Sequence, residues 1–449
     1  MNYLIGLDIG TSSVKGVLMT EDGKIIKTAH GAFSYTRTDN GGVEIEADKF
    51  VDVCFGAIKE LSENADGMIK GICASSASGN LVVLDKDMKP ATPIFNWQDS
   101  RTTNEAKEIL GEIDLNAFYR QIGWPFSYTG FPLALGCYVK KHTPEKIEKC
   151  GMFCMSTEYL YYRLTGKWGI SSSAGTPFYL IDQNTGEYIP EILEALDITE
   201  SRVPPIMPCG SSLGNVTEEA TEKCGLSVET EVVLGSFDHP SAARGVGVFE
   251  EGEILLSCGT SWVGFCPIKD RDKAADAGVL IDPFLSPKGG CWGTMVSVPS
   301  VAERIKLYVN KYIDSTENAY QVLEELAEKS TSGADGLKIN LYDEPYDDKI
   351  LSFSKESIAR AIMEGTVNLL KEKLNVIKDM GIDTKSAVMV GGPSQSKLYQ
   401  RLIEELCGIS VRVIHGANAG AVGAAMLAGI GTGLYSGEAD ANAICNGKE

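Results

Sequence analysis

The chain of 449 residues is long enough for two or three domains, and its 43% hydrophobic and 23% charged residues are typical of a globular protein. With 41 basic against 61 acidic residues, the formal net charge is −20. Such a charge argues against binding to nucleic acid or to an anionic membrane, because both require clustered lysine and arginine.

The cysteines indicate a cytoplasmic protein. Twelve of them are irregularly spaced without a C-x-x-C pair, and there are only four histidines. We therefore expect reduced thiols that pack as small hydrophobic side chains, and no structural zinc site. The N-terminus lacks the basic region of a signal peptide, and the uncharged run 417–433 is too short and too rich in glycine and alanine for a membrane span.

Strands and helices alternate in the first half of the chain. The D-G pair at 22–23 predicts a hairpin turn, and apolar residues three or four positions apart predict a helix over 47–61. The predicted strands are 3–9, 14–20, 25–30, 68–74 and 81–85, and the predicted helices are 47–61 and 101–110.

The second half shows the same alternation, which predicts an α/β architecture in both halves. A boundary is expected between about 205 and 235, which divides the chain into domains 1–225 and 226–449. The predicted strands are 231–235, 253–257, 262–267, 386–390 and 411–414, and the predicted helices are 238–247, 316–330, 354–380, 395–407 and 417–428.

A short internal repeat links the two halves. The tripeptide G-T-S occurs at 10–12 and again at 259–261, each time between two predicted strands. A duplicated fold would place two such turns in equivalent positions, although a tripeptide can also repeat by chance.

The first of these turns has the residues of a phosphate site. Glycine lets backbone amides approach an anion, Thr11, Ser12 and Ser13 add hydroxyl groups, and Lys15 adds a positive charge. Asp8 would end a buried strand with a carboxylate, which favours a nearby cation such as magnesium. The alternative is an ordinary hairpin in which Asp8 caps backbone amides. The segment matches neither a Walker A loop nor a G-x-G-x-x-G fingerprint.

Two more strand-to-helix junctions carry candidate residues. Asp238 precedes Pro240 at the start of a helix and is either an N-cap or a general base, with His239 as a neighbour. The G-G pair at 391–392 stands before another helix, where phosphate or ribose groups can bind. The small residues of 417–431 would let an adenine approach the backbone. The alternative for both segments is tight packing of a helix on a strand.

Together these segments resemble the FGGY family of carbohydrate kinases, in the sugar kinase/Hsp70/actin fold group, from residue 3 to about 431. Each segment is modest alone, but six of them in the order of the family are specific. They are G-L-D-I-G-T-S-S-V-K-G at 6–16, N-W-Q-D-S-R-T at 96–102, Y-L-Y-Y-R-L-T-G at 159–166, G-S-F-D-H-P-S-A-A-R-G-V-G at 235–247, S-C-G-T-S at 257–261 and V-G-G-P-S-Q-S at 390–396.

The resemblance implies two ribonuclease H-like (actin-like ATPase) domains with an interdomain cleft, the first binding sugar and the second binding nucleotide. It implies phosphoryl transfer from Mg-ATP to a hydroxyl of a small sugar, ketose, polyol or sugar acid. Asp238 would be the general base and a metal neighbour, and Asp8 the magnesium ligand. The residues implied to bind the nucleotide are Thr11, Ser12, Lys15, Gly259, Thr260, Gly391, Gly392 and Ser396.

The chain departs from the family where the sugar should bind. A Met-His-Gly segment of xylulose- and gluconate-kinase-like members is replaced by S-S-A-S-G-N at 75–80, and the G-E-R-x-P segment by L-Y-D-E-P at 341–345. The substrate therefore stays open. The candidate sugar contacts are Ser76, Ser78, Asn80, Trp97, Asp99 and Asp238, with core packing as the alternative for Trp97.

Two other functions fit the resemblance less well. One is an actin- or Hsp70-like ATPase that switches conformation around a protein partner, and the other is a non-catalytic binder with an altered sugar loop. The W-x-D segment at 97–99 and the retention of Asp8 and Asp238 favour the kinase. Its partner would be a small sugar or polyol, and a homodimer is common in the family.

Overall fold

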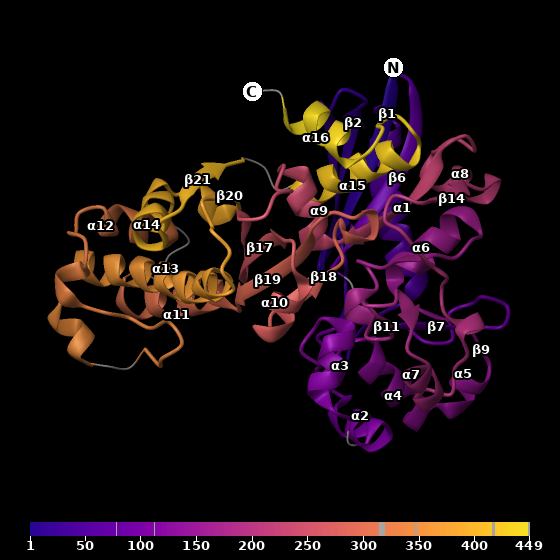
Figure 1. Cartoon of the computed structure of the whole chain (residues 1–449), viewed down its shortest axis with the longest axis horizontal. Helices are drawn as coiled ribbons and strands as arrows, with labels where there is room; N and C mark the ends of the chain where they lie inside the picture. The colour runs from indigo at the N-terminus through magenta and orange to yellow at the C-terminus, as the bar shows by residue number, and fades with distance from the viewer. Residues whose placement is uncertain (78, 112, 314–318, 346–347, 415–417, 448–449) are drawn as a thin grey trace. The chain divides into compact units, whose positions relative to one another are not determined.

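The computed structural model describes residues 1–77, 79–111, 113–313, 319–345, 348–414 and 418–447 (Figure 1). It is an α/β protein, as predicted, with two compact units. The first unit comprises Met1–Gly247, Leu280–Gly290 and Asn418–Glu449, and the second comprises Val248–Val279 and Cys291–Ala417. The chain thus enters the first unit three times, whereas the sequence patterns suggested one boundary at 225. The division into sugar-binding and nucleotide-binding domains stays a prediction.

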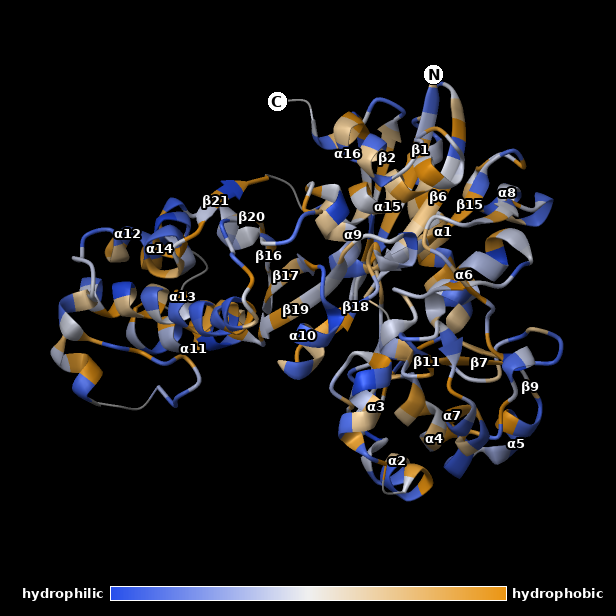
Figure 2. Cartoon of the chain, in the orientation of Figure 1, coloured by the Kyte–Doolittle hydropathy of each residue, from blue (hydrophilic) through white to orange (hydrophobic). Residues whose placement is uncertain are grey.

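The first unit is built on a six-stranded sheet with the strand order β14-β15-β6-β1-β2-β3. Three strands form an antiparallel meander from the N-terminus, and β6 and β15 add to it in parallel with β1. Figure 2 shows hydrophobic residues along β1 and β6, as expected for strands covered on both faces. The strands are β1 (Asn2–Ile9), β2 (Ser13–Thr20), β3 (Ile25–Ala32), β6 (Met68–Ser76), β14 (Ser212–Asn215) and β15 (Glu231–Phe237).

Several helices of this unit pack on the sheet, and the short strands of the unit lie outside this sheet. The helices are α1 (Ala47–Ser62), α2 (Thr103–Leu110), α3 (Leu115–Ile122), α4 (Pro132–His142), α5 (Pro144–Glu148), α6 (Ser156–Thr165), α7 (Pro190–Ala195), α8 (Glu218–Cys224), α9 (Asp238–Gly245), α15 (Ala419–Gly431) and α16 (Glu438–Asn446). The short strands are β4 (Thr36–Arg37), β5 (Val43–Ile45), β7 (Val82–Asp85), β8 (Ile94–Phe95), β9 (Cys150–Cys154), β10 (Ile170–Ser171), β11 (Ile181–Asp182), β12 (Glu187–Tyr188), β13 (Ile206–Met207) and β18 (Leu280–Asp282).

The small residues of α15 serve helix packing. This helix lies on β1, β6 and α9 of the first unit, so that the last segment of the chain lies beside the first (Figure 1). A Cβ atom at Gly6 would come within 1.8 Å of the Ala421 carbonyl oxygen, which shows how closely helix and strand approach. The tight-packing interpretation is therefore confirmed for Ala419–Gly431.

The second unit repeats the arrangement of the first. Its strands follow the order β19-β17-β16-β20-β21, in which β16 and β17 form an antiparallel hairpin and β20 lies parallel to β16. β16 and β17 correspond to β1 and β2, and each G-T-S tripeptide lies at the turn of its hairpin, as the repeat predicted. The strands are β16 (Glu253–Cys258), β17 (Trp262–Ile268), β19 (Trp292–Val298), β20 (Ser386–Gly391) and β21 (Ser410–Val413).

The helices of this unit pack around one long helix, α13, which contacts α11, α12 and α14. The predicted helix 316–330 starts outside the described residues and is seen as α12. The helices are α10 (Arg271–Asp276), α11 (Val301–Tyr312), α12 (Ala319–Ala327), α13 (Lys355–Asp379) and α14 (Lys397–Cys407), and a 3₁₀ helix (Gly392–Gln395) follows β20.

All twelve cysteines are free thiols, and eleven are buried, as expected for small hydrophobic side chains. Burial raises the pKa of Cys150 to about 11 and that of Cys137 to about 12, which keeps these thiols protonated and unreactive. Among the described residues, no helix has both the length and the apolar character needed to cross a bilayer.

Candidate functional site

The carboxyl ends of three parallel strands bring the two predicted aspartates to one edge of the first sheet. Asp8 pairs with Ser75 between β1 and β6, and Phe237 pairs with Ser76 between β15 and β6. β1 and β15 are therefore two strand spacings apart, about 10 Å at the usual spacing. Asp238 directly follows β15, so its carboxylate and that of Asp8 occupy the same edge.

The Asp8 carboxylate lies in an environment that disfavours its negative charge. Burial, followed by the negative charge of Asp238, raises its pKa from 3.8 to about 7, although Lys15 and a hydrogen bond from Ser75 act in the opposite direction. Lys15 stands directly across the hairpin, in register with Asp8. A carboxylate with this pKa is poised to accept a cation, since a bound cation would offset the unfavourable charge.

Gly420 gives the Asp8 carboxylate its space. A Cβ atom at Gly420 would lie 2.7 Å from the Asp8 Cγ and 2.8 Å from its Oδ2, closer than real contacts allow. The Gly420 carbonyl accepts a hydrogen bond from Ser241 Oγ at 2.8 Å, which ties the start of α15 to α9, the helix that begins with Asp238. The start of α15, which borders the Asp8 carboxylate, is thus held to α9, which carries Asp238.

Asp238 is the first residue of α9, and Phe237 occupies the N-cap position. Asp238 Oδ1 accepts a hydrogen bond from the His239 amide at 2.7 Å, and the His239 ring nitrogen Nε2 lies 3.9 Å from the same oxygen. Burial raises the pKa of Asp238, while His239 lowers it. The N-cap interpretation therefore does not hold for this residue, although it does accept one helical amide.

Residues that the sequence analysis did not single out fix the strand before Asp238. The Tyr161 hydroxyl accepts the Gly235 amide at 3.0 Å and donates to the Ala74 carbonyl at 2.8 Å, which bridges β15 and β6 at an irregularity in their pairing. Ser173 Oγ accepts the Phe237 amide at 3.2 Å and donates to the fully buried Asp282 at 2.8 Å.

Tyr161 could have been found from its segment, Y-L-Y-Y-R-L-T-G, whereas Asp282 could not. Asp282 enters the first unit on the segment Leu280–Gly290, far from Ser173 in the sequence. Burial raises its pKa to about 6, and the hydrogen bonds from Ser173 and from the Phe284 amide lower it.

Trp97 connects the hairpin of β1 and β2 to the W-x-D segment. The hairpin closes with a hydrogen bond from the Gly10 amide to the Ser13 carbonyl at 2.9 Å. Trp97 Nε1 donates to Thr11 Oγ1 at 3.0 Å, and its side chain is 39% exposed. The core-packing alternative for Trp97 is therefore wrong. Ser12 at the turn is exposed.

The other predicted sugar contacts are less accessible. Asp99 is fully buried, and its carboxylate accepts hydrogen bonds from the Val43 amide and from Arg101. These bonds stabilise the local structure of the W-x-D segment. Asn80 Oδ1 accepts the Ser156 amide at 2.7 Å at the start of α6, and Ser76 is buried at the end of β6. Ser78 lies outside the described residues.

In the second unit, the turn after β16 and the turn after β20 lie side by side. Cys258 pairs with Gly391, and a Cβ at Gly391 would come within 2.1 Å of the Cys258 carbonyl oxygen. Gly391 also has a φ of +98°, so only glycine fits this position without strain. Gly259 follows Cys258 directly, which places it and the exposed Thr260 near Gly392.

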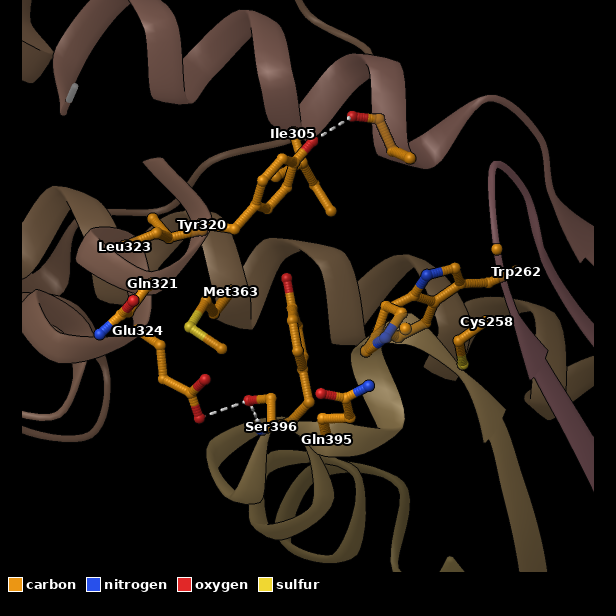
Figure 3. Close-up of a pocket in the computed structure, with 15 residues that line it drawn as sticks. Cys258, Trp262, Ile305, Tyr320, Gln321, Leu323, Glu324, Met363, Gln395 and Ser396 are labelled. Carbon is orange, nitrogen blue, oxygen red and sulfur yellow. Dashed lines mark hydrogen bonds between the residues drawn. The ribbon is translucent and has the colours of Figure 1, made fainter. Parts of the chain in front are cut away.

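A pocket of about 590 Å³ opens at these glycines (Figure 3). Its volume is in the range of small-molecule sites, and its walls are mainly apolar and aromatic. Ser396 lines it as the N-cap of α14, and its hydroxyl donates to Glu324 at 2.6 Å. The lining residues include Gly259, Trp262, Ile305, Tyr320, Leu323, Glu324, Met363, Gly392, Gln395, Ser396 and Tyr399.

The described residues contain no cluster of three or more histidine, cysteine or acidic side chains that could hold a metal by itself. A magnesium ion at Asp8 would therefore take its remaining ligands from water and from substrate oxygens. Magnesium commonly binds through one or two carboxylates together with substrate phosphates, so the donor set at this edge fits that ion and not a closed protein cage.

Comparisons with known proteins cover nearly the whole chain. It is 25% identical over 456 residues to the xylulose kinase of Bacillus subtilis (strain 168), covering 97% of this chain and 89% of that protein. It is 24% identical over 459 residues to the gluconokinase of Bacillus licheniformis, covering 97% and 88%. The crystal structure of ligand-bound xylulose kinase from Lactobacillus acidophilus matches with a TM-score of 0.88 at 20% identity, covering 99% of this chain and 92% of that one.

Plasmodium falciparum glycerol kinase with ADP matches with a TM-score of 0.87 at 18% identity, covering 99% of this chain and 92% of that one. These likenesses confirm the predicted fold class of two actin-like ATPase domains. The model of the FGGY family of carbohydrate kinases, N-terminal domain, matches residues 3–245, more than half of the chain, and that of the C-terminal domain matches 348–432. The chain therefore belongs to the FGGY family of carbohydrate kinases, which are phosphotransferases with an alcohol group as acceptor.

Proposed function

We propose that this protein transfers the γ-phosphoryl group of ATP to a hydroxyl of a small sugar, ketose, polyol or sugar acid, with Asp238 as the general base. The observation that carries the proposal is the placement of Asp8 and Asp238 at the carboxyl ends of β1 and β15, beside the hairpin of Thr11. Asp238 would accept the proton of the acceptor hydroxyl and orient its oxygen for in-line attack. Transfer of this kind depends on positioning and charge neutralisation more than on covalent catalysis.

The second unit supports binding of the nucleotide. A Cβ at Gly392 would meet no atom within 4 Å, and one at Gly259 would meet only the Ser261 carbonyl at 3.8 Å, so both glycines leave room for phosphate oxygens. The adenosine would occupy the 590 Å³ pocket beyond them. Thr260, and in the first unit Thr11, Ser12 and Lys15, would bind the β- and γ-phosphates.

Asp8 would hold magnesium, directly or through water, and bound magnesium would neutralise charge on the phosphates. The raised pKa of Asp8 supports this role, because Lys15 offsets only part of the effect of burial and of Asp238, so the carboxylate gains from a bound cation. Lys15 opposite Asp8 would add a second positive charge.

The proposal is tested by measuring ADP release with Mg-ATP against xylulose, ribulose, gluconate, glycerol and common alditols. We expect turnover that depends on one acceptor class, since xylulose kinases and a gluconokinase are among the relatives. ATP hydrolysis at the same rate with and without every acceptor would instead favour a conformational ATPase. The absence of any turnover together with retained ADP binding would favour a non-catalytic binder.

Gly420→Ala should lower turnover by about tenfold or more with little loss of stability. The added methyl displaces the Asp8 carboxylate, while alanine improves the propensity of α15 by about 1 kcal/mol. Initial rates and thermal melting check both parts. Gly56→Ala is the matched control, because Gly56 lies in α1 with no atom within 4 Å of an added Cβ. Equal activity of both variants would show that Asp8 needs no such space.

Thr11→Ala and Trp97→Phe remove the same hydrogen bond from opposite ends. If Thr11 donates its own hydroxyl hydrogen to a phosphate, Thr11→Ala should raise KM for ATP by about tenfold, whereas Trp97→Phe should mainly raise KM for the sugar. Steady-state kinetics with each substrate varied in turn separate the two. The reverse pattern would mean that this hairpin does not bind the phosphates.

A further inference from the structure

The nucleotide pocket of the second unit contains one acidic side chain, Glu324 of α12, among those that line it. Apolar and aromatic side chains from α11, α12 and α13 line the same pocket, including Ile305, Leu323 and Met363 (Figure 3). The glycines that suit phosphate, Gly259 and Gly392, line the pocket from the turns after β16 and β20. A flat, largely apolar group such as a nucleobase fits the end of the pocket where Glu324 lies better than a phosphate does.

Glu324 is held in one orientation. Its Oε1 accepts a hydrogen bond from Ser396 Oγ at 2.6 Å and a longer one from the Leu398 amide at 3.4 Å. Both donors belong to the start of α14, whose helix dipole stabilises a nearby negative charge. Because Ser396 also accepts the Tyr399 amide, its hydroxyl hydrogen is directed to Glu324.

The second carboxylate oxygen, Oε2, is left for a ligand. Figure 3 shows it turned away from Ser396, toward the space beside Met363. An ionised carboxylate oxygen can only accept hydrogen bonds. With Oε1 already occupied, Glu324 can offer one acceptor to a base and cannot make the paired contact with two neighbouring donors that a free carboxylate can make.

We propose that Glu324 selects adenine nucleotides as the phosphoryl donor, by accepting a hydrogen bond from the exocyclic amino group of the base on Oε2. The inference rests on the proposed function and names a specificity-determining residue for it. Adenine carries a donor at C6, whereas hypoxanthine and guanine carry a carbonyl oxygen there. A carboxylate oxygen facing C6 therefore attracts the first base and repels the other two.

The test is the ratio of kcat/KM with ATP to that with ITP, for the wild type and for Glu324→Gln. In the variant, the amide oxygen should take the place of Oε1 beside Ser396 and Leu398, because both are donors. The amide NH₂ then faces the pocket and offers a donor to C6. We expect the ATP:ITP ratio to fall by about ten- to hundredfold, the size of one charge-assisted hydrogen bond.

Glu328→Gln is the matched control. It removes a carboxylate one turn further along, together with an exposed ion pair to Arg401 of α14, and should leave the ATP:ITP ratio unchanged. An unchanged ratio in Glu324→Gln would overturn the proposal. So would a change in the ATP:dATP ratio alone, because Glu324 would then contact the ribose.

Thermal shifts with ADP and IDP, measured without any acceptor, separate this inference from the proposed function. Ligand binding to the native state raises the melting temperature according to affinity. If no acceptor is ever phosphorylated but ADP stabilises the wild type more than IDP, and Glu324→Gln loses this difference, the catalytic proposal fails and the nucleobase proposal stands.

Discussion

Asp238→Asn should reduce kcat by at least about 10²–10⁴-fold, the usual cost of removing a general base. Asparagine keeps the shape of the side chain and can still accept the His239 amide, so the start of α9 should be preserved. It cannot take a proton from the acceptor hydroxyl. The measurement is kcat at saturating Mg-ATP and sugar, with ADP binding and thermal melting followed in parallel.

His239→Asn is the informative control for this prediction. His239 lies next to the base, with its ring nitrogen 3.9 Å from the Asp238 carboxylate, and it lowers the pKa of Asp238. We expect the control to change turnover by less than about tenfold. Near-wild-type turnover in Asp238→Asn, or an equal loss in both variants, would assign the base elsewhere or to a coupled pair.

Much of the fold could be predicted because local patterns determine it. The buried runs of β1 and β2, the D-G turn before β3 and the apolar face of α1 each identify their element without tertiary information. The repeated G-T-S turns also indicated the duplication, because each lies between two predicted strands.

The division into units could not be predicted in the same way. Leu280–Gly290 and α15 belong to the first unit although segments of the second unit, Val248–Val279 and Cys291–Ala417, precede them in the sequence. No local pattern records which sheet a helix covers. The small residues of α15 fit both a nucleotide site and close contact with β1, and only the packing against Gly6 and Asp8 decides between them.

The candidate site shows the same limit. Asp8 could be singled out because it ends a buried strand with a charge, and Asp238 because it stands at a strand-to-helix junction in a segment that resembles the family. Asp99 has the same chemistry but is buried behind its segment with Arg101, a distinction that depends on tertiary contacts. Glu324 lies on an amphipathic helix where an acidic residue usually faces water, and only its bond to Ser396 distinguishes it.

Asp8→Asn should abolish most turnover and yet stabilise the protein in the absence of magnesium and nucleotide at pH 8. In the unfolded chain the carboxyl group titrates near 3.8, and in the native protein near 7. Between these values the native state binds more protons, so stability falls as pH rises, and the loss is complete above about pH 7. Asparagine carries no charge at any of these pH values and avoids this loss.

The measurement is the difference in melting temperature between Asp8→Asn and wild type, recorded from pH 4 to pH 8 in EDTA. The difference should grow by a few degrees as pH rises from about 4 to about 7 and then level off. Other buried carboxyl groups with raised pKa values, such as Glu158 at about 7 and Asp282 at about 6, are present in both proteins and cancel in the comparison. Asp87→Asn, at an exposed turn, should show no such trend.

Magnesium and nucleotide should reverse the order of stability. A cation beside Asp8 neutralises the charge that burial disfavours, so Mg-ADP should stabilise the wild type more than Asp8→Asn, and the variant should need about ten- to hundredfold more magnesium for its residual turnover. If Asp8→Asn gained as much stability from Mg-ADP as the wild type, the carboxylate would not contribute to metal binding. Its raised pKa would then reflect burial beside Asp238 alone.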